Sequence, residues 1–73
     1  MRSELDALIE KVVREELSKK SCCSMIELYE AVNKVARIPI SHLRYVLREL
    51  LMKKEVKIER AKKFAEWKVY KVR

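Results

Sequence analysis

The hydrophobic residues of this chain recur with two different periods, and the change between them limits the folds that the chain can adopt. Up to about residue 54 they recur every three or four positions, as on one face of an α-helix. From residue 55 onward they alternate with charged residues, as in a half-buried β-strand. The sequence therefore predicts helices followed by strands, which is an α+β arrangement.

The helical part starts with two segments that carry N-terminal capping signals. The first runs from Ser3, a predicted N-cap with Asp6 three residues on, to about Lys19. The second follows Ser24, which forms an S-x-x-E capping box with Glu27, and reaches about residue 36.

The only proline separates the second helix from a third. Pro39 disfavours helical backbone at Ile38, so the second helix must end before it. Ser41 is then the predicted N-cap of a third helix that extends to about Lys54. The segment between the first two helices, residues 21–24, is too short for a helix and fits a brief strand.

The alternating part predicts two strands, over residues 56–59 and 67–72. The intervening residues 60–66 include none of the residue types that make a tight two-residue turn, so we expect a longer loop. An alternative stays open, because four apolar residues also fit a helical period that would extend the third helix. These residues are Ile58, Ala61, Phe64 and Ala65. The rising β-branched and aromatic content favours the two strands.

The order of the elements resembles that of the winged helix-turn-helix family of DNA-binding domains, in particular small transcriptional regulators of archaeal or viral type. The residues that carry the resemblance are the capped helix from Ser24, the turn 37–40, the third helix from Ser41 and the basic hairpin from Val56. The resemblance implies an α+β fold with a three-helix core, a short strand and a C-terminal β-hairpin wing.

The resemblance also implies how the chain is divided. Residues 1–73 would form a single winged-helix domain. Residues 1–20 would be the first helix and a candidate dimer helix, residues 24–54 the helix-turn-helix, and residues 55–73 the wing.

The net charge of +7 is concentrated in the C-terminal part of the chain. Residues 53–73 carry nine Lys or Arg against three Asp or Glu, whereas residues 1–18 carry three against five. A one-sided basic excess is typical of proteins that bind nucleic acid. A lysine-rich surface that only improves solubility is the alternative explanation.

The composition excludes several classes of protein. Without any glycine the chain cannot form the phosphate-binding loops of P-loop or Rossmann proteins. One His and one Asp offer no specific nucleophile–base pair, so we do not expect an enzyme. Cys22 and Cys23 are adjacent and no second pair completes a zinc site, so we expect no metal. No cofactor and no small-molecule ligand are predicted either.

The sequence also leads us to expect a particular cellular location and source organism. Its uncharged stretches are far shorter than the roughly 20 residues that span a bilayer, so we expect no membrane association. No secretory leader is recognisable, which favours a cytoplasmic protein, in the host cell if the source is a virus. The absence of Gln and Thr, together with many charged residues, favours a thermophilic source.

The resemblance implies that the third helix enters the major groove of DNA. Opposite its core face lie Ser41, Arg44, Tyr45 and Arg48, with His42 on the flank. We expect the two arginines to read guanine edges, the tyrosine to reach a phosphate or a thymine methyl group, and the serine to bind a phosphate. The histidine is predicted as a peripheral contact. The alternative is a solvated helix face.

The resemblance implies further that the wing touches phosphates or the minor groove. Lys62 and Lys63 at the predicted tip, flanked by Arg60 and Lys68, would supply salt-dependent affinity without sequence information. A charged loop that only keeps the protein soluble is the alternative. Trp67 is expected to pack the wing against the first or third helix, with nucleobase stacking as the minor alternative.

The first helix is the candidate dimer surface. Its apolar stripe is broad for so small a domain, so we expect part of it to face a second copy. The predicted interface residues are Leu5, Leu8, Ile9, Val12 and Glu16.

The two cysteines should differ in exposure, since neighbours on a strand point to opposite faces. Cys23 occupies the hydrophobic-staple position and is the predicted buried one. For Cys22 two interpretations stay open, a small apolar side chain or an intersubunit disulfide.

Together these features predict a sequence-specific transcriptional regulator that binds double-stranded DNA as a homodimer on a pseudo-palindromic site. The alternative is a winged-helix module for protein–protein interaction in a transcription or replication assembly, with the first helix as the functional face. An RNA-binding protein is less favoured, because the sequence offers no aromatic platform for single-stranded bases.

Overall fold

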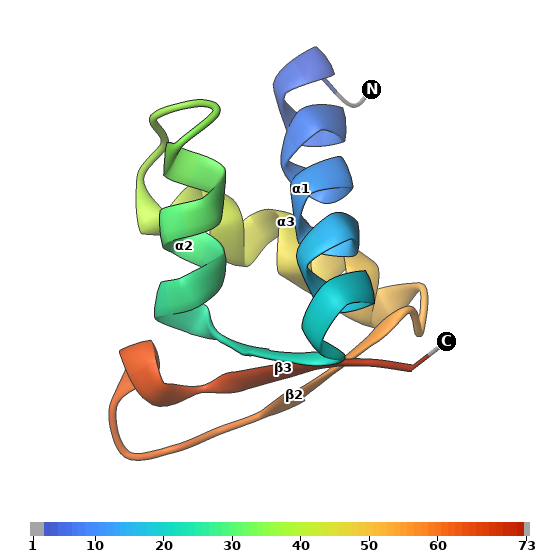
Figure 1. Cartoon of the computed structure of the whole chain (residues 1–73), viewed down its shortest axis with the longest axis vertical. Helices are drawn as coiled ribbons and strands as arrows, with labels where there is room; N and C mark the ends of the chain where they lie inside the picture. The colour runs from blue at the N-terminus through green and yellow to red at the C-terminus, as the bar shows by residue number, and fades with distance from the viewer. Residues whose placement is uncertain (1–2, 73) are drawn as a thin grey trace.

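Three helices and a three-stranded antiparallel sheet make up the computed structural model, which describes residues 3–72 (Figure 1). The helices are α1 (Glu4–Lys20), α2 (Met25–Asn33) and α3 (Ile40–Met52). The strands are β1 (Cys22–Ser24), β2 (Val56–Glu59) and β3 (Lys68–Lys71), with the 3-10 turn η1 (Phe64–Glu66) before the last strand. In Figure 1, α1 and α2 stand side by side, α3 lies behind them, and the sheet crosses their lower end.

The sheet joins the hairpin to the start of α2. Its strand order is β1-β3-β2, so β3 is central. Cys23 and Ile58 both pair with Val69, and these three side chains therefore lie on the same face of the sheet. The backbone N–H of Met25 donates to the carbonyl oxygen of Trp67 at 2.7 Å, so the hydrogen bonds between this segment and the hairpin extend one residue beyond β1.

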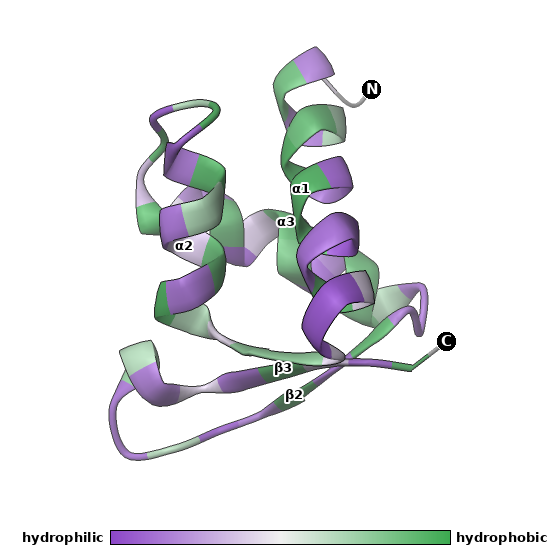
Figure 2. Cartoon of the chain, viewed as in Figure 1, coloured by the Kyte–Doolittle hydropathy of each residue, from purple (hydrophilic) through white to green (hydrophobic). Residues whose placement is uncertain are grey.

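The hydrophobic core lies between the three helices and the inner face of the sheet. The sheet contributes Cys23, Val56 and Val69. The helices contribute Ile9, Val12, Val13, Leu17, Met25, Leu28, Val32, Leu43, Val46, Leu47 and Leu50. Figure 2 shows the contrast with the last turns of α1, where hydrophilic residues predominate.

Two of the three predicted N-caps, Ser3 and Ser24, are present. The Ser3 hydroxyl accepts from the backbone N–H of Asp6 at 3.1 Å. At the start of α2 the Ser24 hydroxyl accepts from the Glu27 backbone, and the Glu27 carboxylate accepts from the Ser24 backbone at 3.0 Å. These bonds satisfy amide groups that the first turn of a helix leaves without partners.

Two predicted helix boundaries are wrong. α2 ends at Asn33 rather than near residue 36. The Asn33 side chain donates to the carbonyl oxygen of Tyr29 at 2.8 Å, a local bond of the kind that competes with continued helix. α3 begins at Ile40 with Pro39 as its N-cap, so Ser41 lies inside the first turn and does not cap it.

The C-terminal part is a hairpin, and the two predicted strands are confirmed. The alternative, in which the third helix continues through Phe64, is wrong. α3 ends because Lys54 adopts a left-handed conformation with φ of 61°. The backbone N–H groups of Lys54 and Glu55 then bond to the carbonyls of Leu51 and Leu50, which is a Schellman motif. The chain thus makes, with lysine, the turn for which glycine is usually used.

Together these elements form the predicted α+β fold, with a winged-helix-like topology: three helices, a short strand and a C-terminal hairpin in one antiparallel sheet. The hairpin from β2 to β3, including its loop, is called the wing below.

Candidate nucleic-acid interface

A groove of about 610 Å³ separates α3 from the wing. This α3–wing groove has a mixed lining of arginines and apolar side chains. From α3 it is lined by Ser41, Arg44, Tyr45, Leu47, Arg48 and Leu51, from the wing by Ile58, Arg60, Phe64 and Trp67, and from α2 by Met25. It therefore brings together four of the five α3 residues predicted for DNA and one of the four from the wing.

Two aromatic rings and two arginines are stacked at the wing end of this groove. The Phe64 and Trp67 rings meet edge to face, with centroids 4.9 Å apart. Arg44 places its guanidinium carbon 4.7 Å from the Phe64 centroid, and Arg60 places its own 5.2 Å from that of Trp67. The Trp67 indole N–H donates to the carbonyl oxygen of Ala61 at 3.0 Å. The loop is thus folded back onto α3.

Trp67 is half-buried and packs against the core, so it holds the wing against the helices. Its neighbour Phe64 does the same. Phe64 is not among the residues predicted for the site, although an aromatic residue in a loop with several cations is a recognisable signal for cation–π contacts.

Arg48 and Tyr45 lie on the solvent side of α3. Tyr45 is 55 % exposed, and Met52, two turns further along the helix, is 76 % exposed. With Ser41, these residues form the outer stripe of α3.

His42 lies on the other flank of α3, where it pairs through Nε2 with the Asp6 carboxylate of α1. The hydrogen bond from His42 lowers the pKa of the Asp6 carboxyl. The predicted peripheral DNA contact is thus engaged within the protein and joins the N-terminal ends of two helices. No local sequence signal indicates this pair, because its members are thirty-six positions apart.

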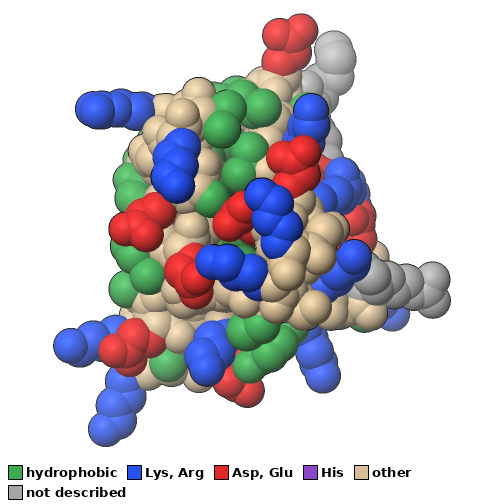
Figure 3. All heavy atoms as spheres, in the orientation of Figure 1, with side chains coloured by type: hydrophobic (Ala, Val, Ile, Leu, Met, Phe, Trp, Pro, Cys, Tyr) green, Lys and Arg blue, Asp and Glu red, His purple; other side chains and the backbone are tan. Residues whose placement is uncertain are grey.

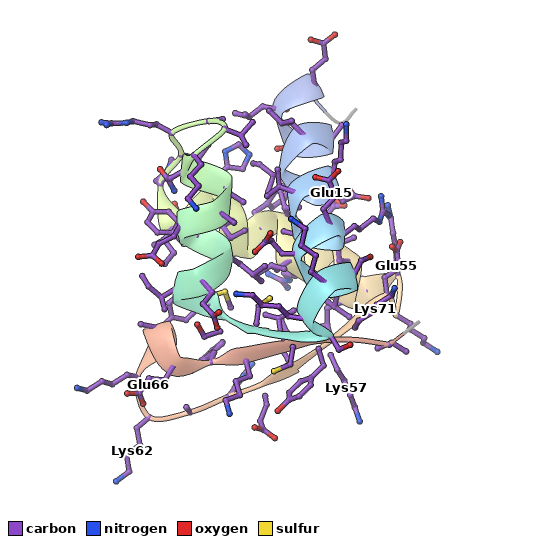
Figure 4. All side chains as sticks on the ribbon, in the orientation of Figure 1. Glu15, Glu55, Lys57, Lys62, Glu66 and Lys71 are labelled. Atoms are coloured by element: carbon purple, nitrogen blue, oxygen red, sulfur yellow. The ribbon has the colours of Figure 1, made fainter. Side chains whose placement is uncertain are left out.

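The wing cations lie in two places. Lys62 and Lys63 are exposed in the loop, and Figure 4 shows Lys62 extending away from the rest of the molecule. Lys68 pairs in the sheet with Ser24 and Glu59, on the face opposite to Val69. It therefore lies on the outer face of the sheet, as does Lys57, and outside the α3–wing groove.

Ion pairing divides the cations of the molecule. Arg14 bonds to both Glu10 and Glu55 at 2.7 Å, and Lys20 bonds to Glu27 at 3.0 Å. Figure 3 shows this mixture of blue and red side chains over the α1 side of the molecule. Within residues 3–72 no ion pair engages the predicted DNA-binding cations. These are Arg44, Arg48, Arg60, Lys62, Lys63 and Lys68.

A larger depression, about 760 Å³, lies between the C-terminal ends of α1 and α3. Its cations include Arg14 and Lys53, which both approach the buried Glu10 carboxylate. Arg14 also pairs with Glu55 there, so only Lys54 and Lys71 of its four cations have no carboxylate partner within residues 3–72, against all three arginines of the α3–wing groove.

The predicted dimer residues of α1 are only partly accessible. Ile9 and Val12 are buried in the core of their own chain, so in the folded monomer they offer little or no surface to a second copy. Glu16 is largely covered and lies 3.8 Å from Lys19. Leu5 and Leu8 keep exposed surface. The stripe is broad because the core uses most of it.

Both cysteines are free thiols, and Cys23 is the buried one, as the staple position predicts. Burial raises the pKa of the Cys23 thiol. Cys22 is half-buried on the outer face of the sheet, where it pairs with Tyr70.

Comparison with protein-family models, with curated proteins and with solved structures finds no match for this chain. No helix within residues 3–72 is long and apolar enough to cross a membrane. Over the same residues, no three His, Cys, Asp or Glu side chains come together in a group that could hold a metal ion.

Proposed function

We propose that the protein is a sequence-specific transcriptional regulator that binds double-stranded DNA, with α3 in the major groove and the wing along the phosphate backbone. The observation that carries this proposal is the set of six cations on α3 and the wing that no described carboxylate neutralises. Cations that neutralise phosphates and release counterions supply most of the non-specific affinity for DNA.

The dimensions of α3 support the same assignment. Its 13 residues make a helix about 20 Å long, and a helix with side chains is about 10–12 Å wide. The major groove of B-DNA, about 12 Å wide, accepts such a helix. The outer stripe of α3 combines a serine, a tyrosine, an arginine and a methionine, which can serve phosphate, base-edge and thymine-methyl contacts.

Selection of bound sequences from a random duplex pool, followed by titration at several salt concentrations, tests the proposal. We expect one enriched motif and an association constant that falls steeply as salt rises. Binding without a preferred motif would reduce the function to non-specific DNA binding. No salt-dependent binding to any duplex would contradict it.

A second function, docking of a protein partner, is favoured by one observation. Tyr45 and Met52 expose apolar surface on the outer stripe of α3, and Leu51, which lines the α3–wing groove, is also exposed. Apolar exposure of this kind also occurs at protein interfaces. The salt titration separates the two functions, because an apolar protein interface depends far less on salt than phosphate contacts do.

A homodimer is the form in which we propose that the protein acts. A two-fold dimer places two recognition helices about 34–36 Å apart, which matches successive major grooves. The exposed surface of Leu5 and Leu8 on α1 is the part of the predicted interface that remains open to a second copy.

A further inference from the structure

Arg44 and Arg48 lie one turn apart on α3, but their guanidinium groups have different surroundings. That of Arg44 lies over the Phe64 ring at 4.7 Å and within 6.0 Å of the Trp67 ring. Arg48 has neither a ring contact nor an ion pair with any residue between 3 and 72. An arginine held on an aromatic face is less available to a base edge than one that extends into solvent.

The contact of Arg44 is part of a larger stack that crosses from α3 to the wing. The stack runs from Arg44 over Phe64 and Trp67 to Arg60. It is anchored at its far end, because Trp67 bonds to Ala61 in the loop and accepts from Met25 at the start of α2. The stack therefore links α3, the wing and α2.

The part of the wing that such a link can hold is its loop. Eight residues, from Arg60 to Trp67, separate β2 from β3 and lie beyond the paired strands of the three-stranded sheet. Beyond β2 and β3, the loop rests on Phe64 and Trp67 where they pack on the core. A guanidinium on the outward face of these rings covers them and fixes their distance from α3.

We propose, on the basis of the DNA-binding function above, that the two arginines have separate roles. Arg44 is a positioning residue that holds the wing at a fixed distance from α3, and Arg48 is the residue of α3 that reads a guanine. The ligand is thus a duplex in which one G·C pair faces the middle of α3, while the wing follows the neighbouring backbone.

The positioning role is tested first in the free protein, by NMR of the arginine side chains. Ring currents should shift the δ-methylene and Nε–H resonances of Arg44 upfield of those of Arg48. Phe64→Leu should move the Arg44 resonances toward ordinary values and leave those of Arg48 in place. Arg44→Ala, at an exposed position, should change the fluorescence of Trp67 without unfolding the protein. Unshifted Arg44 resonances in the unaltered protein would overturn the positioning role.

The reading role is tested on the selected duplex and on duplexes with each base pair replaced. Arg48→Ala should reduce discrimination at one G·C pair by roughly 10- to 100-fold. Arg44→Ala should weaken binding to all these duplexes by the same factor, and Arg44→Lys should restore part of the loss, because an ammonium also binds aromatic faces. Arg44→Ala and Phe64→Leu together should cost no more than the larger single change. Loss of discrimination at one base pair in Arg44→Ala would overturn the assignment.

These outcomes separate the inference from the proposed function. Failure of the unaltered protein to bind any duplex contradicts DNA binding and with it the reading role of Arg48. The NMR measurement needs no DNA and decides the positioning role of Arg44 in either case.

Discussion

Within residues 3–72, two residues adopt left-handed backbone, and each directly follows a helix or its last turn. Ser21 follows α1 with φ of 65°, and Lys54 follows α3 with φ of 61°. Each places a backbone N–H on a carbonyl of the preceding turn. For an L-residue this conformation costs about 1–2 kcal/mol, which glycine avoids at the expense of more entropy in the unfolded chain.

Lys54→Gly should therefore raise the free energy of unfolding, by about 0.5–1 kcal/mol. The matched control is Met52→Gly, at an exposed right-handed position two residues earlier, which should lower it by about 1 kcal/mol. Urea denaturation of the three proteins measures both changes. Equal destabilisation by the two glycines would show that the left-handed turn stores no strain.

Glu27 connects helix capping to the pH dependence of stability. Its carboxylate accepts from the Ser24 backbone and bonds to Lys20, and the backbone bond is the main reason that its pKa falls from 4.5 to about 2. Because the folded pKa is the lower one, the stabilisation is complete above pH 4.5 and is lost as the pH falls toward 2.

Glu27→Gln should flatten this part of the stability curve between pH 4.5 and 2. Urea midpoints measured at several pH values compare the two proteins. Glu30→Gln is the control, since Glu30 is exposed on the same helix and none of the described side chains bonds to its carboxylate. If Glu27→Gln lost as much stability between pH 4.5 and 2 as the unaltered protein, the role of the capping box would be contradicted.

Where a helix start or a strand is determined by neighbouring residues, the sequence pattern predicts it correctly. The Ser24–Glu27 capping box fixed the start of α2, and alternation identified β2 and β3. The end of α2 depends on a single side-chain bond from Asn33, and its competition with the helix is not visible in a hydrophobic pattern.

The candidate site was predictable to a lesser degree. The spacing of Arg44 and Arg48 placed them on one side of α3, but the stack of Arg44 on Phe64 joins residues twenty positions apart and requires the tertiary fold. Likewise, the sequence predicts that Lys68 flanks the wing tip, yet the pairing register of β3 places it on the outer face of the sheet.

The wing as an element should contribute affinity that does not depend on DNA sequence. We expect Lys62→Ala/Lys63→Ala to lower the slope of log K against log salt by up to about 1.8, the value for two lost phosphate contacts, with the selected motif unchanged. Lys11→Ala/Lys34→Ala removes the same charge from exposed positions on α1 and just after α2, outside the α3–wing groove. The same slope change in both double variants would indicate that net charge, rather than the wing, is responsible.

At the scale of the whole molecule, the distribution of charge suggests an orientation on DNA. Acidic and basic side chains are paired over α1, whereas the cations of α3 and the wing that are predicted to bind DNA form no ion pair with a carboxylate within residues 3–72. A polyanion would be attracted to the α3–wing side, and α1 would point away from it. An arrangement of this kind leaves α1 free for contact with a second copy.

Burial in the monomer leaves fewer α1 residues for a dimer interface than the sequence predicts. Because Ile9 and Val12 are buried in the core, a dimer through α1 must use Leu5, which is 36 % exposed, and Leu8. We expect Leu8→Glu to shift the sedimentation coefficient from that of a dimer to that of a monomer and to abolish the preference for a symmetric site. Val35→Glu introduces the same charge at an exposed apolar position after α2 and should leave the dimer intact. A monomeric unaltered protein, or a Leu8→Glu variant that stays dimeric, would remove α1 from the mechanism. The DNA contacts of α3 would then have to provide their specificity from a single half-site.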